Sequence, residues 1–483
     1  MYRRERFFID GVWQPPASGE LVPVHSPASE EPIGAVPRAS APDVDRAVAA
    51  ARRALESGPW PRMAPAERAD WLIAMAAHLA ARRGALAELS VDEAGVPVTY
   101  ARQRENGPIA ILDYYARLAR EFRFRERRPT ATGHALVLRE PVGVVAAIVP
   151  FNGPLMSAAA KIAPSLAAGC PIVFKPAPET PLDAFALADA AEAVGLPPGV
   201  LNILPADREI GERLVSHPGV DRVVFTGSTQ GGRRVAQLCA QSFKRVTLEL
   251  GGKAAAILLG DAPLESALAS ILPLSFFNSG QACIALSRIL APRDRYDEVV
   301  EAVAAAAAEL VVGDPRDEKT QQGPLISARQ RERVLALIAA GRAEGASLAC
   351  GGGVPRALDR GHYVEPTVFR GVESAMRIAR EEFFGPVVCV IPYRNEDDAV
   401  AIANDSPYGL SGAVFTRDVA RGVAIAGRIQ VGTFGVNGYA LDPSLPFGGR
   451  KESGIGREFG LEGLAEYTEL KAIALPPGFE GNP

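Results

Sequence analysis

Apolar runs of strand length alternate with segments of helical periodicity through the middle of the chain. The expected strands cover residues 142–149, 171–174, 201–204, 222–225 and 245–250, and the expected helices cover 158–168, 181–194, 208–216 and 231–241. Strands that are apolar throughout are buried on both faces, and strands that alternate with helices form parallel sheets. The pattern predicts an α/β fold with a doubly wound parallel sheet, which binds ligands at the carboxyl ends of its strands.

The regions on either side of this block have different patterns. The opening segment holds short apolar runs between turns rich in proline and glycine, which favours edge strands and loops. Helical spacing follows over residues 41–55, 65–81 and 106–120. A second alternating block begins after Gly252 with a strand at 254–259 and a helix at 264–277, and it continues to Pro446. The tail, residues 464–475, has a strand pattern of its own.

Residues 122–128 form a short run dense in arginine. The simpler interpretation is a solvated connector between two larger units. The alternative is a strand that leaves its domain and pairs with a partner subunit.

Composition limits the classes of protein. A chain of 483 residues is long enough for about two to four domains. Hydrophobic residues make up 48% and charged residues 22%, which allows a large core, and the net charge of −4 disfavours a nucleic-acid partner. No apolar run approaches the length of a membrane span or of a secretion signal, so we expect a cytoplasmic protein without a membrane partner.

The cysteines and histidines favour neither disulfides nor a metal. The five cysteines are odd in number and no two are spaced as C-x-x-C, while the five histidines are scattered and no H-E-x-x-H motif occurs. We therefore expect no catalytic metal.

One cysteine stands in a context that suits a nucleophile. Cys283 follows the polar, turn-forming residues Asn-Ser-Gly-Gln at the end of an apolar helix. A thiol held in such a loop beside polar groups can form a thiolate and attack an electrophilic carbon. The competing interpretation is a cysteine that only packs, which is the commonest role of a single cysteine.

Attack on a carbonyl also requires a base and a donor for the developing oxyanion. Glu249 ends an apolar strand just before a Gly-Gly turn, where partial desolvation raises the pKa of a carboxyl into the range of a general base. Asn152 follows the strand 142–149 and can present its amide group to an oxyanion. The alternatives are a Glu249–Lys253 ion pair at a strand end and an asparagine that only makes the turn.

A glycine-rich turn follows the strand 222–225 and opens a helix. The residues Gly227-Ser228-Thr229-Gln230-Gly231-Gly232 would let the backbone approach a pyrophosphate at a helix N-terminus. The segment is not the G-x-G-x-x-G fingerprint, and Gly252-Lys253-Ala254 is not a P-loop.

Taken together and in this order, the motifs resemble the aldehyde dehydrogenase superfamily along nearly the whole chain. The matching segments are PFNGPL at 150–155, FKPA at 174–177, the turn 227–232, ELGGK at 249–253, GQAC at 280–283, EEFFGP at 381–386, NDSPYGL at 404–410 and PFGGRKESG at 446–454. The resemblance implies a hydrolytic NAD(P)-dependent enzyme with Cys283 as nucleophile, Asn152 as oxyanion donor and Glu249 as base. It assigns Lys161 and Glu458 to a proton relay, for which a structural ion pair is the alternative.

The resemblance also implies the cofactor-binding residues and the domains. Cofactor binding would fall to Val149, Pro150, Phe151, Lys175, Ala177, Glu179, Gly211, Phe225, Thr226, Gly227, Ser228, Gly232, Leu250, Gly251, Glu382 and Phe384. The expected parts are a dinucleotide-binding domain at 1–121 and 142–250, a catalytic domain at 251–455, and a bridging β-segment at 122–141 and 456–483. NAD is the expected cofactor with NADP as the alternative, and a homodimer or homotetramer is the expected assembly.

The sequence departs from the family pattern in two respects. The third residue after Lys175 is Pro178, where the family commonly has a glutamate that binds the ribose hydroxyls and opposes a 2′-phosphate; Glu179 comes one step later. Aromatic residues common along the substrate tunnel are replaced by Gly153 and Ala160. We expect a wider tunnel that admits branched, aromatic or terpenoid aldehydes.

The expected reaction oxidises an aldehyde to its acid. Cys283 forms a thiohemiacetal and then a thioester, and water activated by Glu249 hydrolyses the thioester. The alternatives are a CoA-acylating semialdehyde dehydrogenase, which would generally lack Glu249, a catalytically silent scaffold, and a thiol esterase that needs no cofactor.

Overall fold

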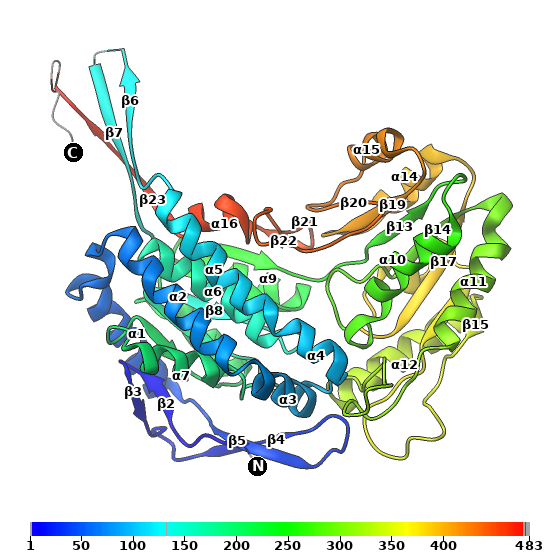
Figure 1. Ribbon diagram of the computed structural model, residues 1–483, viewed down its shortest axis with the longest axis horizontal. Helices are drawn as coiled ribbons and strands as arrows, with labels where there is room; N and C mark the ends of the chain where they lie inside the picture. Colours follow the sequence, from blue (N-terminus) through cyan, green and yellow to red (C-terminus); the bar gives the residue numbers. More distant parts are fainter. Residues whose placement is uncertain (1, 132, 477–478, 480–483) are drawn as a thin grey trace.

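The computed structural model describes residues 2–131, 133–476 and 479. The end of the predicted bridging segment 456–483, after residue 476, therefore lies outside the described residues except for residue 479. Two large twisted sheets stand side by side, and a narrow three-stranded sheet projects from the first of them (Figure 1). The two sheets confirm the predicted α/β class with two doubly wound units.

The first large sheet holds the five predicted strands of the central block. Its order is β22 (Gly454–Ile455), β12 (Arg245–Glu249), β11 (Arg222–Thr226), β8 (Val145–Ile148), β9 (Ile172–Lys175), β10 (Leu201–Ile203), β2 (Phe7–Ile9) and β3 (Val12–Gln14). The strands from β12 to β10 run parallel, and antiparallel strands close both edges.

Alternate residues of each central strand enter different cores. On β8, Val145 and Ala147 face the core shared with α2 (Pro65–Ala81), α5 (Asn106–Glu121), α6 (Pro154–Ala168) and α7 (Ala184–Val194). Ala146 and Ile148 face the core shared with α1 (Ala41–Glu56), α8 (Arg208–Ser216) and α9 (Thr229–Ala240). Since side chains alternate along a strand, helices on both faces require apolar residues at every position, which is why the run was continuous.

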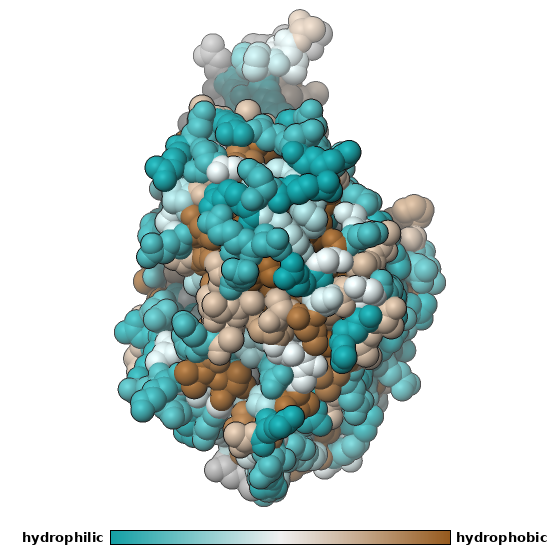
Figure 2. Space-filling view, turned by 90° about the vertical axis from the view of Figure 1, so that its right-hand side faces the viewer, coloured by the Kyte–Doolittle hydropathy of each residue, from teal (hydrophilic) through white to brown (hydrophobic). Residues whose placement is uncertain are grey.

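The second sheet repeats this arrangement. Its order is β15 (Ser347–Cys350), β16 (Thr367–Arg370), β17 (Val387–Tyr393), β14 (Arg288–Pro292), β13 (Ala255–Leu258), β19 (Gly412–Phe415) and β20 (Gly435–Val436), parallel except between β15 and β16. One face carries α12 (Ala328–Ala343), α13 (Arg377–Arg380), α14 (Glu396–Asn404) and α15 (Val419–Ala426), and the other carries α10 (Leu264–Phe276) and α11 (Tyr296–Ala308). On this side the molecule is hydrophilic over most of its surface with scattered hydrophobic spots (Figure 2).

The projecting sheet corrects the interpretation of the arginine-rich run as a connector. Its strands are β6 (Arg125–Thr130), β7 (Gly133–Pro141) and β23 (Thr468–Ala474), in the antiparallel order β23-β7-β6. Nearly all of β6 is exposed, so its backbone bonds to β7 hold it rather than an apolar face. No hydrophobic alternation is needed in such a strand, and the sequence pattern therefore favoured a connector over the alternative of a strand.

The remaining elements connect these units. They are β1 (Tyr2–Arg3), β4 (Leu21–His25) and β5 (Pro32–Pro37) in an N-terminal sheet, β18 (Tyr408–Gly409) paired with β21 (Arg450–Lys451), the helices α3 (Arg83–Ala94), α4 (Val98–Arg104) and α16 (Gly460–Ala465), and short 3₁₀ turns at Trp60–Arg62, Phe277–Gly280 and Arg293–Arg295. The expected tail strand thus starts at Thr468 rather than 464, because α16 extends to Ala465. Within the described ranges, no helix is both long and apolar enough to cross a bilayer.

Candidate active site

A cavity of about 650 Å³ opens where the carboxyl ends of β8, β11 and β12 face segments of the second sheet. The predicted site residues in its wall are Pro150, Phe151, Asn152, Thr226, Gly227, Ser228, Glu249, Leu250, Gly251, Cys283, Glu382, Phe384 and Glu458. Strands of a parallel sheet all end at one edge, so loops far apart in sequence meet there. The structure therefore brings the candidate nucleophile, base and oxyanion donor into one cavity.

The nucleophile loop has an unusual backbone. Asn278, Ser279 and Gly280 all have positive φ, at 50°, 56° and 70°. Left-handed geometry is costly for a residue with a side chain and persists only where surrounding contacts impose it. A Cβ on Gly280 would lie 2.1 Å from the Gly385 carbonyl oxygen, so only glycine fits there.

Buried hydrogen bonds fix this loop. Ser279 Oγ donates to the Gly323 carbonyl at 2.7 Å, and the Gln281 side chain bonds the Asn278 carbonyl and the Ile326 N–H. Asn278 Nδ2 donates to the Asn152 carbonyl at 3.0 Å. The loop that carries Cys283 is thus tied directly to the predicted oxyanion donor. Sequence analysis did not assign Asn278 or Gln281 to the site, although both stand in the polar run that pointed to Cys283.

Glu249 is the last residue of β12 and is almost fully buried. Burial, and then repulsion from Glu458, raise the pKa of Glu249 to about 8, against a lowering by its hydrogen bond with Cys283. Its Oε1 has no hydrogen-bond partner among the described residues. A carboxylate of raised pKa is a stronger base than an ordinary glutamate, as the predicted role requires.

Cys283 is partly exposed to the cavity. Burial of the sulfur raises the pKa of the Cys283 thiol well above its usual range, and the neighbouring Glu249 carboxylate raises that pKa further. The thiol therefore holds its proton in this state, and Glu249 is an adjacent group able to take it.

The position of the base depends on a segment that follows the second sheet. Strand β22 pairs with β12 so that Gly454 lies opposite Glu249. Ser453 Oγ donates to the Gly251 carbonyl at 2.6 Å, and the Leu250 N–H donates to the Ser453 carbonyl at 3.0 Å. This segment therefore holds the end of β12 and the first glycine of the Gly-Gly turn.

Lys161 lies behind the cavity wall rather than in it. It is fully buried on α6, and its Nζ donates to Glu458 Oε1 at 2.8 Å and to Thr226 Oγ1 at 2.7 Å. Glu458 lines the cavity and is close enough to Glu249 to raise the pKa of that carboxyl. Lys161, Glu458 and Glu249 are thus neighbouring ionisable groups that lead from the core to the cavity.

The glycine-rich turn leaves room for a ligand's phosphates. A Cβ on Gly227 would lie 2.6 Å from the Phe225 ring and one on Gly231 2.9 Å from it, so the ring fills the space beneath the turn. Ser228 is the N-cap of α9 and accepts from the Gly231 N–H at 3.1 Å. A bare backbone at a helix N-terminus fits a pyrophosphate. Gly232 packs behind the turn, where a Cβ would lie 2.5 Å from Leu250.

The predicted ribose residues occupy two separate places. Glu382 accepts from the Gly252 N–H at 2.9 Å, and a Cβ on Gly251 would lie 2.6 Å from Glu382 Oε2. Lys175 ends β9, burial lowers its pKa to about 8, and its Nζ bonds only the Pro176 carbonyl among the contacts described. Lys175 is buried and Glu382 is half-buried, and both are polar groups able to receive ligand hydroxyls.

The other predicted cofactor residues lie outside the cavity wall. The Val149 N–H donates to the Lys175 carbonyl, and Ala177 is buried in the loop after β9. Gly211 lies close to the Lys175 side chain, since a Cβ on Gly211 would be 3.2 Å from Lys175 Cε. Glu179 is paired with Arg329 of α12 at 3.7 Å.

Helix α12 holds one cofactor segment and was not predicted to be part of the site. Gln330 Nε2 donates to the carbonyls of Phe383 and Phe384, and Arg333 Nη2 donates to the Glu382 carbonyl at 3.0 Å. These bonds support Phe384, whose φ is 53°. The residues lie about fifty positions from the segment they hold, and no local pattern marks them.

Gly153 and Ala160 line the cavity, as the second departure from the family pattern suggested. The nearest atom to a Cβ on Gly153 would be Ser157 Oγ at 3.7 Å, an ordinary contact. The backbone of Gly153 has φ −153°, which any residue adopts. The space at Gly153 is therefore open, and a side chain there would enter the cavity.

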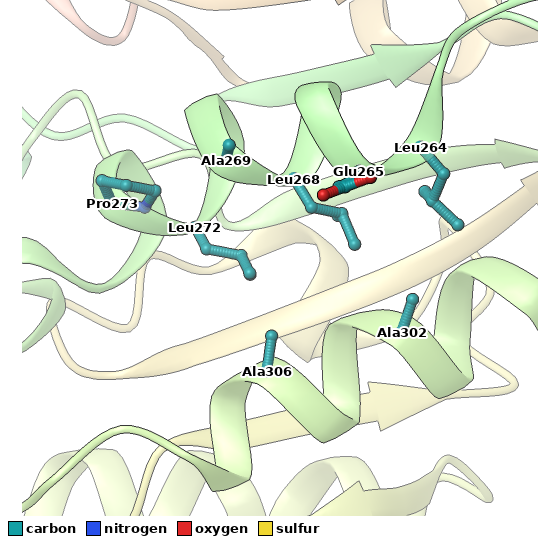
Figure 3. A pocket seen from close by; sticks show the side chains of 8 residues that line it. All are labelled: Leu264, Glu265, Leu268, Ala269, Leu272, Pro273, Ala302 and Ala306. Carbon is teal, nitrogen blue, oxygen red and sulfur yellow. The ribbon is translucent and has the colours of Figure 1, made fainter.

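A second hollow of about 660 Å³ lies between α10 and α11 (Figure 3). Its lining is apolar except for Glu265 and carries no cysteine, histidine or amide side chain. It offers neither a nucleophile nor a pair of converging polar groups, so it is not a candidate active site.

Comparison with known proteins gives a consistent result. The model of the "Aldehyde dehydrogenase family" matches residues 13–473. The chain is 48% identical to geranial dehydrogenase of Castellaniella defragrans over 98% of both chains. It is also 48% identical to an aldehyde dehydrogenase of Mycobacterium tuberculosis solved with NAD+, covering 99% and 100% of the two chains with a TM-score of 0.98. A variant of aldehyde dehydrogenase C from Pseudomonas syringae, solved with NAD+ and octanal, is 42% identical over 97% of this chain and 96% of its own, with a TM-score of 0.94.

Proposed function

The chain belongs to the aldehyde dehydrogenase family, and from that premise we propose that Cys283, Asn152 and Glu249 carry out the oxidation of an aldehyde to its acid. Family membership makes the protein an enzyme of aldehyde oxidation, in preference to the CoA-acylating, esterase and silent-scaffold alternatives. One observation carries the assignment of roles. The buried Glu249 carboxyl lies beside the Cys283 thiol, and the loop that carries Cys283 is hydrogen-bonded to the Asn152 carbonyl.

The first chemical step is thiol addition. Cys283 loses its proton and its sulfur attacks the aldehyde carbon, which forms a thiohemiacetal whose oxyanion accepts from the Asn152 side chain and the Cys283 backbone N–H. An oxidised nicotinamide cofactor supplies the redox chemistry by accepting a hydride. Loss of hydride from the thiohemiacetal leaves a thioester on Cys283.

The second step is hydrolysis. Glu249 takes a proton from water, the hydroxide adds to the thioester carbon, and the carboxylic acid leaves as the sulfur regains a proton. A base with a pKa of about 8 suits this task near neutral pH. Lys161 and Glu458 pass the proton onward from Glu249, a role supported by their contact through a 2.8 Å bond.

The cofactor we propose is NAD. The glycine turn at Gly227–Gly232 would hold the pyrophosphate, Lys175 the adenosine ribose, and Glu382 with Phe384 the nicotinamide ribose. Two solved relatives contain NAD+. Because Pro178 stands where a glutamate would oppose a 2′-phosphate, NADP is the alternative cofactor to test in parallel.

The substrate class we propose is a bulky or long aldehyde, including branched, aromatic and terpenoid ones. Support comes from the open space at Gly153 and from the small side chain of Ala160 in the cavity wall. One relative is named for the oxidation of geranial and another was solved with octanal, and both compounds are long aldehydes.

The units and assembly follow the same proposal. The dinucleotide-binding unit comprises 1–121 and 142–250, the catalytic unit 251–455, and the bridging segment 122–141 with 456–483. We further propose a cytoplasmic homodimer or homotetramer in which the projecting sheet of β6, β7 and β23 contacts a partner subunit. The exposed Leu470 and Ile473 on β23 support a contact there.

The experiment is reduced-cofactor formation with a panel of aldehydes, using NAD+ and NADP+ in parallel. Wild type is compared with Cys283→Ala and with Cys350→Ala, a matched cysteine at the edge of the second sheet. We expect activity in wild type and Cys350→Ala and none in Cys283→Ala. Activity in Cys283→Ala would refute the role of the thiol, and inactivity of the wild type with every aldehyde would refute the proposal as a whole.

A further inference from the structure

The linker between the two large sheets contains a buried lysine that the proposed reaction does not use. Lys253 follows the Gly251-Gly252 turn, comes just before β13, and is 2% exposed. Within the described ranges its Nζ has no hydrogen-bond partner, and neither has Glu249 Oε1. The structure therefore contradicts the alternative in which Glu249 and Lys253 form an ion pair at the strand end.

The Lys253 ammonium lies over an aromatic ring instead. Its Nζ is 3.7 Å from the centroid of the Phe383 ring, and Phe383 is itself buried. The face of an aromatic ring attracts a cation, and the attraction is strongest where water is excluded. A buried charge without a hydrogen-bonded partner is costly, so the ring supplies a contact that the ammonium otherwise lacks.

Phe383 belongs to the segment that carries the predicted nicotinamide-ribose residues Glu382 and Phe384. The left-handed backbone of Phe384, with φ 53°, costs free energy and persists only where neighbouring contacts impose it. The bonds from Gln330 and Arg333 hold the main chain of this segment against α12. Lys253 adds a contact of a different kind, because it acts on a side chain of the segment.

The linker that presents Lys253 is itself fixed in place. Arg288 of β14 is buried and donates through Nε to the Lys253 carbonyl at 2.9 Å, and its terminal nitrogens donate to two carbonyls at the end of α14. The Gly252 N–H donates to Glu382 Oε1 at 2.9 Å. Two adjacent linker residues thus contact two adjacent residues of the cofactor segment, Gly252 with Glu382 and Lys253 with Phe383.

We propose that Lys253 is a positioning residue whose ammonium holds the Phe383 ring and so keeps Glu382 and Phe384 arranged to bind the nicotinamide end of the cofactor. The inference rests on the proposed function, which supplies the roles of Glu382 and Phe384. Lys253 does not line the catalytic cavity. Its loss should make the binding-competent arrangement less populated, which lowers the apparent affinity for the cofactor until saturating cofactor restores that arrangement.

The charge on Lys253 can be varied with pH. Burial lowers its pKa to about 7, Cys389, Glu382 and Glu381 oppose that shift, and Arg288 adds to it. The ammonium exists below this pKa and the neutral amine above it, so the contact with the ring is present at low pH and weakens as the pH rises through about 7. Burial also raises the pKa of Glu382 to about 7, so wild type and variants must be compared at each pH.

A narrow hollow on another side of Lys253 supplies the competing explanation. The hollow has a volume of about 10 Å³, room for about one water molecule, and Tyr408 and Ser411 line it together with Lys253. Ser411 Oγ is buried and has no hydrogen-bond partner among the described residues. If Lys253 served this hollow rather than the ring, Ser411→Ala would have the same effect as Lys253→Met.

The test measures kcat and the KM for NAD+ and for one aldehyde, and the dissociation constant of NADH from its fluorescence. The proteins are wild type, Lys253→Met, Phe383→Leu, the double variant and Ser411→Ala, each at about pH 6 and about pH 9, on either side of the pKa of Lys253. Lys244→Met is the matched control, because Lys244 is also buried but donates to two backbone carbonyls, at 2.7 and 2.6 Å.

At about pH 6, Lys253→Met should raise the KM for NAD+ and the dissociation constant of NADH by about 5- to 30-fold, the range of a desolvated cation–π contact. The kcat at saturating NAD+ and the KM for the aldehyde should stay within about threefold. At about pH 9 the difference from wild type should shrink to less than about threefold, because the wild-type lysine is then neutral. Phe383→Leu should raise the KM for NAD+ less in Lys253→Met than in wild type. Lys244→Met and Ser411→Ala should leave both cofactor constants unchanged.

Unchanged cofactor constants in a folded Lys253→Met would overturn the inference, and so would an equal effect of Ser411→Ala. An increase of the same size at both pH values would overturn it too, and would assign Lys253 to packing alone. If Lys253→Met does not fold, Lys253→Arg decides, because arginine stays charged at both pH values. The KM of wild type relative to Lys253→Arg should then rise from about pH 6 to about pH 9, and a constant ratio contradicts the inference. Failure of wild type to bind NADH or to oxidise any aldehyde would instead refute the proposed function.

Discussion

The molecule contains two hollows of nearly equal volume, about 650 Å³ for the catalytic cavity and about 660 Å³ for the groove between α10 and α11. The groove exists because Ala269, Ala302 and Ala306 are too small to fill the gap between two helices (Figure 3). The cavity exists because strand ends of the first sheet meet loops of the second, and polar side chains from both line it.

The difference is therefore in the polar groups and not in size. In the cavity a thiol, a carboxyl and an amide converge, and burial raises the pKa of Glu249 and Cys283. In the groove the single charged residue, Glu265, opens the exposed first turn of α10, where a helix favours an acidic side chain. Perturbed groups that converge in one hollow mark a catalytic site better than volume does.

The largest effect we predict in the cavity, apart from loss of the nucleophile, is that of Glu249→Gln. Steady-state turnover should fall by about 10²- to 10⁴-fold, the usual contribution of a general base. A burst of reduced cofactor equal to one turnover should remain, because the base acts on the thioester after hydride loss. Rapid-mixing absorbance measures the burst and the steady state together.

The pH profile sharpens this prediction. Only an ionised Glu249 accepts a proton, so with a pKa of about 8 the wild-type steady-state rate should rise with pH up to about 8 and level off above it. Glu249→Gln should lack this rise. Equal loss of burst and steady state in Glu249→Gln would move its role from hydrolysis to deprotonation of Cys283.

Asn152→Ala comes next. Removing one oxyanion donor should lower kcat by about 10²- to 10³-fold. The Cys283 loop should persist, because Asn278 bonds the backbone carbonyl of residue 152 and not its side chain. Alkylation of Cys283 by iodoacetamide at the wild-type rate, with lost turnover, is the expected combination. Loss of both would mean that the substitution disturbs the loop.

Gly153→Phe should have a smaller and selective effect. A ring in the open space at residue 153 should lower kcat/KM for a bulky aldehyde by about 10- to 100-fold, in line with the cost of overpacking, and leave acetaldehyde within about threefold. Wild-type rates that are equal for acetaldehyde and a bulky aldehyde, and unchanged by Gly153→Phe, would contradict the wide-tunnel proposal. Gly427→Ala, in an exposed turn, serves as a glycine control.

The smallest effect is expected in the groove. Leu272→Ser removes a half-buried apolar side chain from its wall and should change kcat/KM by less than about twofold, with a stability loss of about 1–2 kcal/mol. Thermal unfolding and the standard assay check both. A large loss of activity in a normally folded Leu272→Ser would mean that the two hollows are coupled, and the contrast between them would fail.

The alternation of strands and helices in residues 142–250 was predictable because burial on both faces of a sheet demands apolar residues at every position. Strand β6 stood only as the alternative to a connector, and within the bridging segment that the resemblance implied, since its exposed arginines carry no such demand and only its backbone is paired. The helices α3 and α4 were also not predicted, and α3 has weak contrast between its faces, with buried residues nearly all round.

The same distinction applies to the candidate site. Cys283, Glu249 and Asn152 stand in short motifs at strand and helix ends, so their placement in one cavity followed from the parallel sheet. Gln330 and Arg333 act through hydrogen bonds to a segment about fifty residues away, and no motif marks them. The role of such residues becomes visible only in the folded structure.

The pairing of β22 with β12, together with the hydrogen bonds of Ser453 to the end of β12, has a consequence for biosynthesis. Ribosomes make the chain from the N-terminus, so the base, the nucleophile, the whole second sheet and all of the first sheet except β22 are synthesised before the segment that fixes the base in place. Glu458 and Phe459, which complete the cavity wall, are made later still. A nascent or prematurely terminated chain therefore carries its thiol without a finished reaction chamber, and catalytic competence reports that synthesis has passed this segment.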